Sequence, residues 1–236
     1  MAMEFSYRAY FSAIHIQAAA LFAMQAKAIE VARADTAKSA TDHEAYVVGA
    51  VLSSVAFLEA AINELFADAS DRWFHPRSRS KRKLPSATVR LMANMWEHGI
   101  PRTARYSVLE KYAIALILAR KKPTDKGAPV WQATEVLIRL RNALIHYEPT
   151  DEPELIFEDD KYKPPDGEHK LAKALRGRFP LNSLAAPNHP YFPDQILGYG
   201  CAAWAVNTSI AFADEFAQRL GSDLSHWNYH VDLVTE

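Results

Sequence analysis

Helical periodicity over a long apolar stretch is the feature that most constrains how this chain can fold. Between residues 42 and 70 the large apolar residues recur three or four positions apart, which places them on one face of a helix. This series comprises Val47, Val51, Val55, Leu58, Ile62 and Leu65. Asp42 is expected to cap this helix at its start, and the helix is expected to end near Ser70. Because no long stretch alternates apolar and polar residues as a strand does, the sequence predicts an all-α helical bundle.

The remaining chain predicts further helices around one irregular segment. Helices are expected at about 4–34, 86–98, 106–120, 130–147 and 194–220, with Pro129 at the start of the fourth of these. Eight of the thirteen prolines fall between Pro149 and Pro193. Residues 149–194 are therefore expected to form an irregular insertion, with one short helix near 168–177, inside a single domain of residues 1–236.

Composition and charge limit the partners and the location of the protein. The chain is 49% hydrophobic and 23% charged, which is typical of a soluble globular protein, and its net charge is −1. Nucleic-acid binding would therefore depend on local basic patches. The single cysteine, Cys201, excludes an internal disulfide and indicates a reducing cytoplasm. The start of the sequence lacks a signal-peptide pattern, and the apolar stretch 46–62 is too short to span a bilayer, so no membrane partner is expected. No cofactor is expected either.

The stretch RLRNALIHYEP, residues 139–149, places polar side chains on an otherwise apolar helix. At 100° per residue the core-facing stripe would consist of Val130, Ala133, Leu137, Leu140, Leu144 and Tyr147. Roughly the opposite side would carry Glu135, Arg139, Asn142 and His146, and the flank would carry Ile138, Arg141 and Ile145. Two isoleucines beside a polar stripe that points away from the core predict a second contact surface, such as a partner subunit.

The residues RNALIH, 141–146, resemble the R-x4–6-H signature of the HEPN superfamily, in the form with Asn directly after Arg. The stretch SSVAFLEAAINELF, residues 53–66, resembles the acidic helix that accompanies this motif in bacterial HEPN proteins. The resemblance covers about residues 5–148 and the last helix, but not the proline-rich insertion.

The resemblance implies a metal-independent endoribonuclease that acts as a homodimer with a composite site, as a toxin or phage-defence effector. A separate antitoxin protein would then be a further partner. His146 would act as base or acid, Arg141 would hold the phosphate oxygens and Asn142 would orient the phosphate or the imidazole. The products would be a 2′,3′-cyclic phosphate and a 5′-hydroxyl. Because Arg141 and His146 are about 140° apart on an ideal helix, they would meet one phosphate only if the helix end deforms or if two subunits contribute.

Three further residues are expected to support this site. Glu59 and Asn63 form an i,i+4 pair on a strongly apolar helix, and a buried Glu requires a partner. Glu59 would bind Arg141 or His146, as similar acidic positions do in the superfamily, or it would pair structurally with another basic group. Arg139 would contact phosphate or form a salt bridge with Glu135, four residues earlier.

A basic run, RSRSKRK at residues 77–83, follows Trp73, Phe74 and His75. Cations beside aromatic rings are typical of RNA contacts, although such runs are often only solvated loops. The expected RNA-binding residues are Arg77, Arg79, Lys81, Arg82 and Lys83. His226 and His230 lack a third ligand in view, so no metal site is expected. The alternatives are a catalytically inactive HEPN-like module that binds nucleotides or proteins, and a structural bundle in which the motif is accidental.

Overall fold

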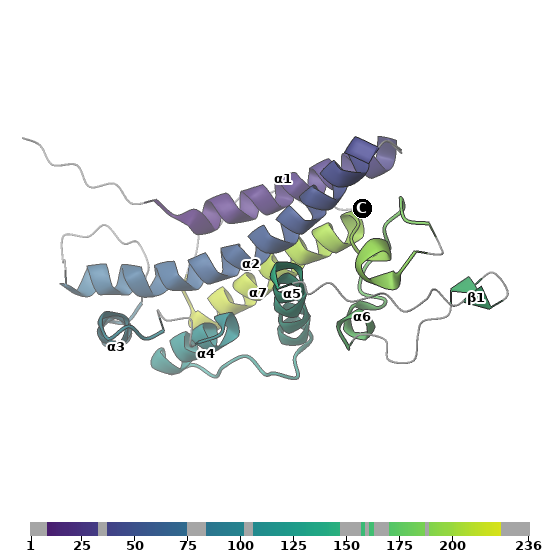
Figure 1. Ribbon diagram of the computed structural model, residues 1–236. Coiled ribbons are helices and arrows are strands. Elements are labelled where there is room, and N and C mark those ends of the chain that lie inside the picture. Colours follow the sequence, from purple (N-terminus) through teal and green to yellow (C-terminus); the bar gives the residue numbers. More distant parts are fainter. Residues whose placement is uncertain are drawn as a thin grey trace, which may run out of the picture. The chain divides into compact units, whose positions relative to one another are not determined.

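The computed structural model describes residues 9–32, 37–74, 84–101, 106–146, 157–158, 161–162, 170–186 and 189–222. The helices are α1 (Phe11–Ala32), α2 (Ala37–Phe74), α3 (Ser86–Glu97), α4 (Val108–Leu118), α5 (Pro129–Ile145), α6 (Lys170–Leu175) and α7 (Tyr199–Leu220). A kinked segment, Tyr191–Gln195, in which Phe192 has extended backbone, precedes α7. Within these ranges the strands are β1 (Phe157–Glu158) and β2 (Lys161–Tyr162), which form one antiparallel pair. The predicted all-α class is confirmed, and Figure 1 shows the order of the helices.

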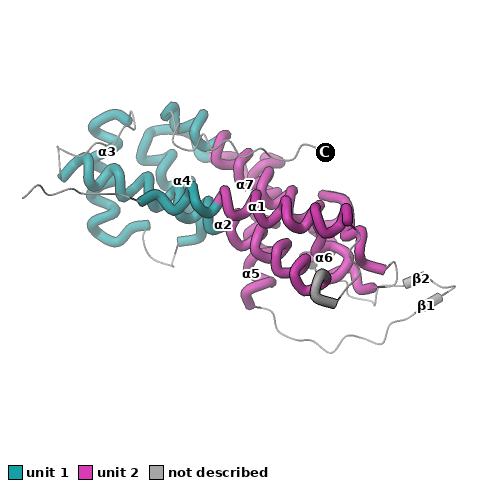
Figure 2. The backbone as a smooth tube through the Cα atoms, turned by 90° about the horizontal axis from the view of Figure 1, so that it is seen from above, with its two compact units in different colours: residues 1–15, 56–123, 216–229 teal, residues 16–55, 124–215, 230–236 magenta. Residues whose placement is uncertain are grey.

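The chain divides into two compact units, which Figure 2 distinguishes by colour. The first unit comprises residues 1–15, 56–123 and 216–229, and therefore includes α3 and α4. The second comprises residues 16–55, 124–215 and 230–236, and therefore includes α5 and α6. Helices α1, α2 and α7 each contribute residues to both units.

Helix α2 carries the core series that the sequence predicts. All six of its periodic apolar residues are buried in the unit to which they belong. The predicted boundaries were wrong, because the helix begins at Ala37, contains Asp42 and continues past Ser70 to Phe74. No Gly or Pro occurs between Ala37 and Asp42 or between Ser70 and Phe74, so nothing in these stretches stops the helix. By length and composition alone, Ala40–Phe74 could also cross a membrane, although half of its most apolar window is buried within the protein.

In the first unit, α1 begins against a carboxylate from α2. Ala9 and Tyr10 are not helical, and α1 starts at Phe11, later than the sequence predicts. Glu64 accepts hydrogen bonds from the backbone N–H of Ser12 at 2.9 Å and from its hydroxyl at 2.6 Å. The first N–H groups of a helix lack internal partners and favour negative charge, so Glu64 stabilises the start of α1.

Helices α3 and α4 lie where the sequence predicts them. Ser107 and Glu110 form a reciprocal capping box that sets the first turn of α4. Tyr112 then donates from its hydroxyl to the carbonyl oxygen of Leu58 at 2.9 Å. Its ring meets Phe216 edge to face, with centroids 4.7 Å apart. These contacts join α4 to α2 and α7 within the first unit.

In the second unit, close backbone approach fixes the start of α7. The short helix predicted near 168–177 is present as α6, whereas α7 begins at Tyr199, later than the expected residue 194. A Cβ on Gly200 would collide with the carbonyl oxygen of Pro180. A Cβ on Gly198 would lie 2.6 Å from Cα of Asn182. Only residues without side chains allow the chain to pass so closely here.

Candidate functional site

Helix α5 carries the motif, and its first turn explains where it starts. Pro129 occupies the first helical position, where its missing N–H and fixed φ are tolerated. The buried residues are Trp131, Thr134, Val136, Leu137 and Leu140. The predicted core stripe is thus only partly correct, because Val130, Ala133 and Leu144 are half-buried and the buried face also includes Trp131, Thr134 and Val136. Tyr147, the last residue of that stripe, lies outside the described residues.

The polar side of α5 faces solvent as the periodicity predicts. Glu135, Arg139, Asn142 and His146 are all exposed. On the flank, Ile145 is exposed and Ile138 is half-buried. The end of α5 therefore presents two polar side chains, Asn142 and His146, next to an apolar side chain that its own unit does not cover.

Arg141 differs from its exposed neighbours because part of its guanidinium is buried. In the described part of the chain three buried side-chain N or O atoms have no hydrogen-bond partner, namely Ser54 Oγ, Ser222 Oγ and Arg141 Nε. Only the last belongs to a charged group. A buried donor without a partner costs about 1–3 kcal/mol, and more in a charged group, so Nε of Arg141 carries a cost that an acceptor would relieve.

His146 marks the point at which the backbone leaves the helix. It is the C-cap residue, with φ −106° and ψ 39°, and its N–H donates to the carbonyl oxygen of Asn142 at 2.9 Å. Because φ sets the direction of Cβ, the His146 side chain does not occupy the position that an ideal helix would give it. The imidazole is exposed at the C-terminal end of α5.

The end of α3 repeats part of this arrangement, which the sequence analysis missed. His98 is the C-cap of α3, and its N–H donates to the carbonyl oxygen of Asn94. Asn94 and His98 are both exposed and have the same i,i+4 spacing as Asn142 and His146. Five residues before His98, however, the chain carries the buried Ala93 in place of an arginine. Arg141 is therefore what distinguishes the motif from an ordinary helix end in this protein.

Glu59 and Asn63, the predicted supporting pair on α2, bind a lysine of α4 and not a residue of the motif. Nζ of Lys111, from α4, donates to Oε1 of Glu59 at 3.1 Å and to Oδ1 of Asn63 at 3.3 Å. All three residues belong to the first unit, whereas the motif belongs to the second. Of the two pairings that the sequence left open for Glu59, the structure shows the one with another basic group. A lysine buried at this position gave no signal in the sequence.

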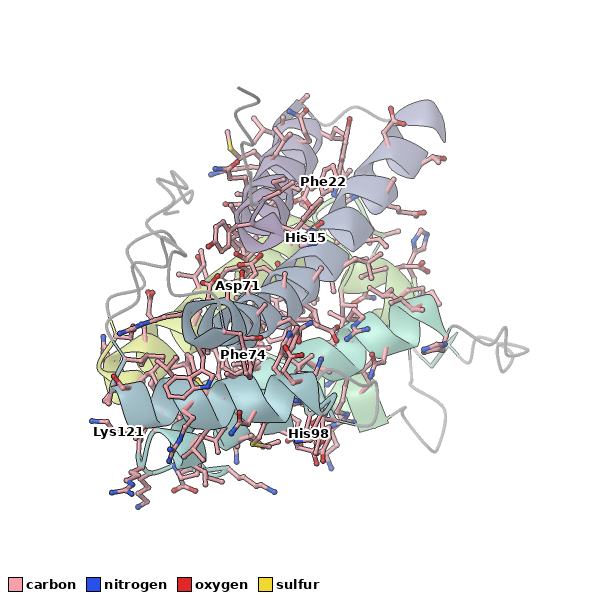
Figure 3. The ribbon with its side chains drawn as sticks, turned by 90° about the vertical axis from the view of Figure 1, so that its left-hand side faces the viewer. His15, Phe22, Asp71, Phe74, His98 and Lys121 are labelled. Atoms are coloured by element: carbon pink, nitrogen blue, oxygen red, sulfur yellow. The ribbon has the colours of Figure 1, made fainter. Side chains whose placement is uncertain are left out.

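The aromatic residues at the end of α2 are accessible. Trp73 and Phe74 are both exposed, and Figure 3 labels Phe74 there, together with Asp71 one turn earlier and His98 at the end of α3. The five basic residues between Arg77 and Lys83 lie outside the described residues, as do His226 and His230.

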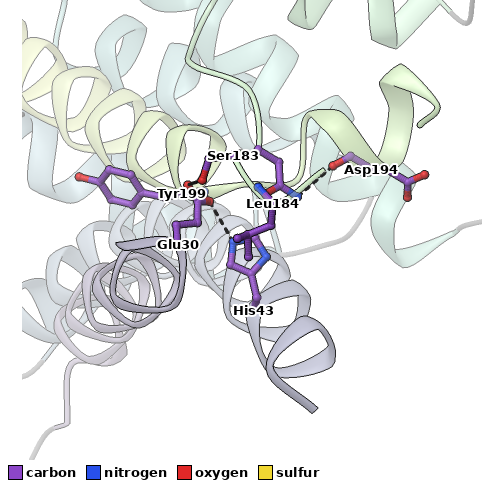
Figure 4. Close-up of polar contacts among 7 residues, drawn as sticks. Glu30, His43, Ser183, Leu184, Asp194 and Tyr199 are labelled. Atoms are coloured by element: carbon purple, nitrogen blue, oxygen red, sulfur yellow. Dashed lines mark hydrogen bonds and ion pairs between the residues drawn. The ribbon is translucent and has the colours of Figure 1, made fainter. Parts of the chain in front are cut away.

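A second polar cluster, around Glu30, also escaped the sequence analysis. Oε1 of Glu30 lies 2.9 Å from Nε2 of His43 and accepts the backbone N–H of Tyr199 at 2.6 Å, while Oε2 accepts the hydroxyl of Ser183 at 2.9 Å (Figure 4). Burial on its own would raise the pKa of Glu30. The hydrogen bonds from His43, Tyr199 and Ser183, with the charge of His43, outweigh burial and lower that pKa. This cluster holds α1, α2 and the start of α7 together.

No group of three or more His, Cys, Asp or Glu residues that could hold a metal ion occurs within the described ranges. Comparison of the whole chain with protein-family models, with curated proteins and with solved structures finds no match.

Proposed function

We propose that this protein is a HEPN-like, metal-independent endoribonuclease that acts as a cytoplasmic homodimer. The observation that carries the proposal is the buried Nε of Arg141, which lacks a hydrogen-bond partner among the described residues. Arg141 lies on the flank of α5, next to Asn142 of the polar face. A phosphate oxygen would satisfy this donor, and guanidinium binds phosphate with two parallel hydrogen bonds.

The chemistry follows from the neighbouring side chains. An imidazole can take the proton of a 2′-hydroxyl or deliver one to the leaving 5′-oxygen, and His146 is exposed for either role. Arg141 would stabilise the charge that develops on the phosphorane, and Asn142 would orient the phosphate through its amide. The reaction would release a 2′,3′-cyclic phosphate and a 5′-hydroxyl.

A composite dimer site would supply two copies of each group. The exposed Ile145 beside Asn142 and His146 offers apolar surface for a partner copy of α5. About a two-fold axis, the same patch would meet itself and bring two imidazoles towards one cleft. The exposed Trp73 and Phe74, with the basic residues 77–83 of the sequence, would provide further RNA contacts.

A module that binds a nucleotide or a protein without cleaving is the second candidate. The Asn94–His98 pair favours it, because that pair shows that an Asn and a His at this spacing also end a helix without an arginine. An unpartnered Arg141 would hold a phosphate equally well in a protein that only binds.

Cleavage of total RNA by purified protein in excess EDTA tests the proposal. Wild type should produce ends with a 2′,3′-cyclic phosphate, and His146→Ala should lose this activity. His98→Ala is the matched control, because it removes an exposed C-cap histidine that also follows an Asn by four residues. Equal losses in both variants, or no cleavage by wild type, would overturn the catalytic proposal. Wild-type RNA binding without cleavage would instead support the binding module.

A further inference from the structure

The exposed face of α1 carries no charge. Its most exposed large residues in the second unit are Leu21 at 52%, Met24 at 46% and Val31 at 74%, and Gln17, Gln25 and Ala28 are exposed between them. The helix contains only two residues of the Asp, Glu, Lys and Arg class. Lys27 lies over the ring of Tyr199, and Glu30 is held in the cluster with His43. Both charges are thus committed within the unit.

The exposed residues follow a heptad. Positions 14, 21 and 28 are Ile, Leu and Ala, and positions 17, 24 and 31 are Gln, Met and Val, which correspond to the a and d sites of a two-helix seam. Two copies of this seam also match each other when the helices run antiparallel. In an antiparallel pair centred between Phe22 and Ala23, Leu21 would meet Met24 of the other copy, and Gln17 would meet Ala28 of the other copy.

The absence of charge restricts what can cover this face. A partner that placed a charged side chain against Leu21 and Met24 would bury that charge without a counter-ion, which is costly. A matching face must therefore be apolar and uncharged, and the chain itself provides one with the right spacing. Contiguous apolar surface of this kind on a soluble protein marks an interaction site.

We propose that α1 is a self-association surface, through which two copies of this chain pair as antiparallel helices. A 22-residue helix is about 33 Å long, and a contact strip about 10 Å wide would cover about 330 Å² per copy. A stable standard interface needs about 800 Å² per partner, so this dimer should be weak, with a dissociation constant on the order of 10–100 µM.

This surface is separate from the motif helix. In Figure 1, α1 lies above α2 and α5 lies below it, so the two surfaces belong to different helices. The proposal therefore goes beyond the proposed function and does not depend on it. A change on α1 should alter association, whereas His146→Ala should alter only cleavage. If both surfaces pair with copies of themselves, the chain forms assemblies larger than a dimer.

Sedimentation of the full chain, from well below to well above this dissociation constant, provides the first test. Leu21→Glu should raise the dissociation constant by about 100-fold or more, because two carboxylates would approach each other near the two-fold axis. Ile117→Glu is the matched control, since Ile117 is equally exposed but lies on α4, and it should change nothing. A wild-type protein that stays monomeric throughout, or that binds neutral lipid vesicles through Leu21 instead, would overturn the proposal.

Cross-linking with a short bismaleimide tests the antiparallel register. In this register the two copies of residue 24 lie about 4.5 Å apart along the axis, whereas the two copies of residue 31 lie about 25 Å apart. Met24→Cys should therefore cross-link efficiently and Val31→Cys should not. The native Cys201 will not interfere, because it is buried and burial raises its pKa to about 12. Efficient cross-linking of Val31→Cys would overturn the antiparallel register, and failure of both variants would overturn the α1 contact.

Discussion

Nε2 of His43 lies 2.9 Å from Oε1 of Glu30, and this contact joins α2 to α1 in the second unit. Both side chains are largely removed from solvent, with 2% of His43 and 12% of Glu30 exposed. Glu30 also accepts the backbone N–H of Tyr199, at the first residue of α7. A single carboxylate therefore anchors three helices, and the stability of the unit depends on its charge.

Acid should weaken the second unit through Glu30. Because its pKa in the folded protein lies below the ordinary value of 4.5, the ionised carboxylate stabilises the fold above that pH, and this contribution is lost as the pH falls through the folded pKa. Glu30→Gln should cost about 2–3 kcal/mol at neutral pH, because charged hydrogen bonds and the partner of a buried His43 are lost. It should also remove the contribution of Glu30 to the acid-dependent loss of stability that we expect for wild type in urea unfolding below this pH. Glu44→Gln, which changes an exposed carboxylate next to His43 on α2, is the control, and an unchanged acid profile in Glu30→Gln would contradict this assignment.

The sequence predicted the helices well, because burial along one helix is encoded in the spacing of its own residues. The core series of α2 and the exposed side of α5 both follow from periods of three and four. Contacts between distant segments leave no such pattern. Glu30 meets Tyr199 across 169 positions, and Lys111 meets Glu59 across 52, so neither partner could be identified from a local period. The predicted start of α2 at Asp42 was wrong because a residue that often caps a helix is also tolerated inside one when its neighbours favour helix.

The pairing of Lys111 with Glu59 predicts that Glu59 acts on stability. Lys111 is 2% exposed, whereas Glu59 is 44% exposed and partly screened by solvent. Glu59→Ala should therefore lower the free energy of unfolding by about 1–2 kcal/mol, because it leaves the Lys111 ammonium with Asn63 as its remaining acceptor among the described residues of α2. The double variant Glu59→Ala, Lys111→Met should recover much of this loss, since an apolar side chain of similar length needs no counter-ion. RNA cleavage per folded molecule should not change. Loss of cleavage without loss of stability would instead place Glu59 in the site.

Substitution of Arg141 should change RNA cleavage strongly and the free energy of unfolding little. Its Nε is a buried donor that lacks a partner among the described residues, so Arg141→Met removes a desolvation cost while it keeps the packing of the side-chain stem. We expect the free energy of unfolding to stay the same or to rise by up to about 1 kcal/mol. Cleavage should fall by about 100-fold or more, because the charge that stabilises the phosphorane is lost.

Two companion variants of Arg141→Met complete the measurement, with unfolding and cleavage followed on the same samples. Arg141→Lys keeps the charge without the planar fork and should fall between Arg141→Met and wild type in cleavage. Arg90→Met, which changes an exposed arginine on α3, should leave both quantities close to wild type. If Arg141→Met instead destabilises the protein by more than about 2 kcal/mol and cleavage falls only with the folded fraction, then the guanidinium serves packing and the assignment of Arg141 to phosphate binding is wrong.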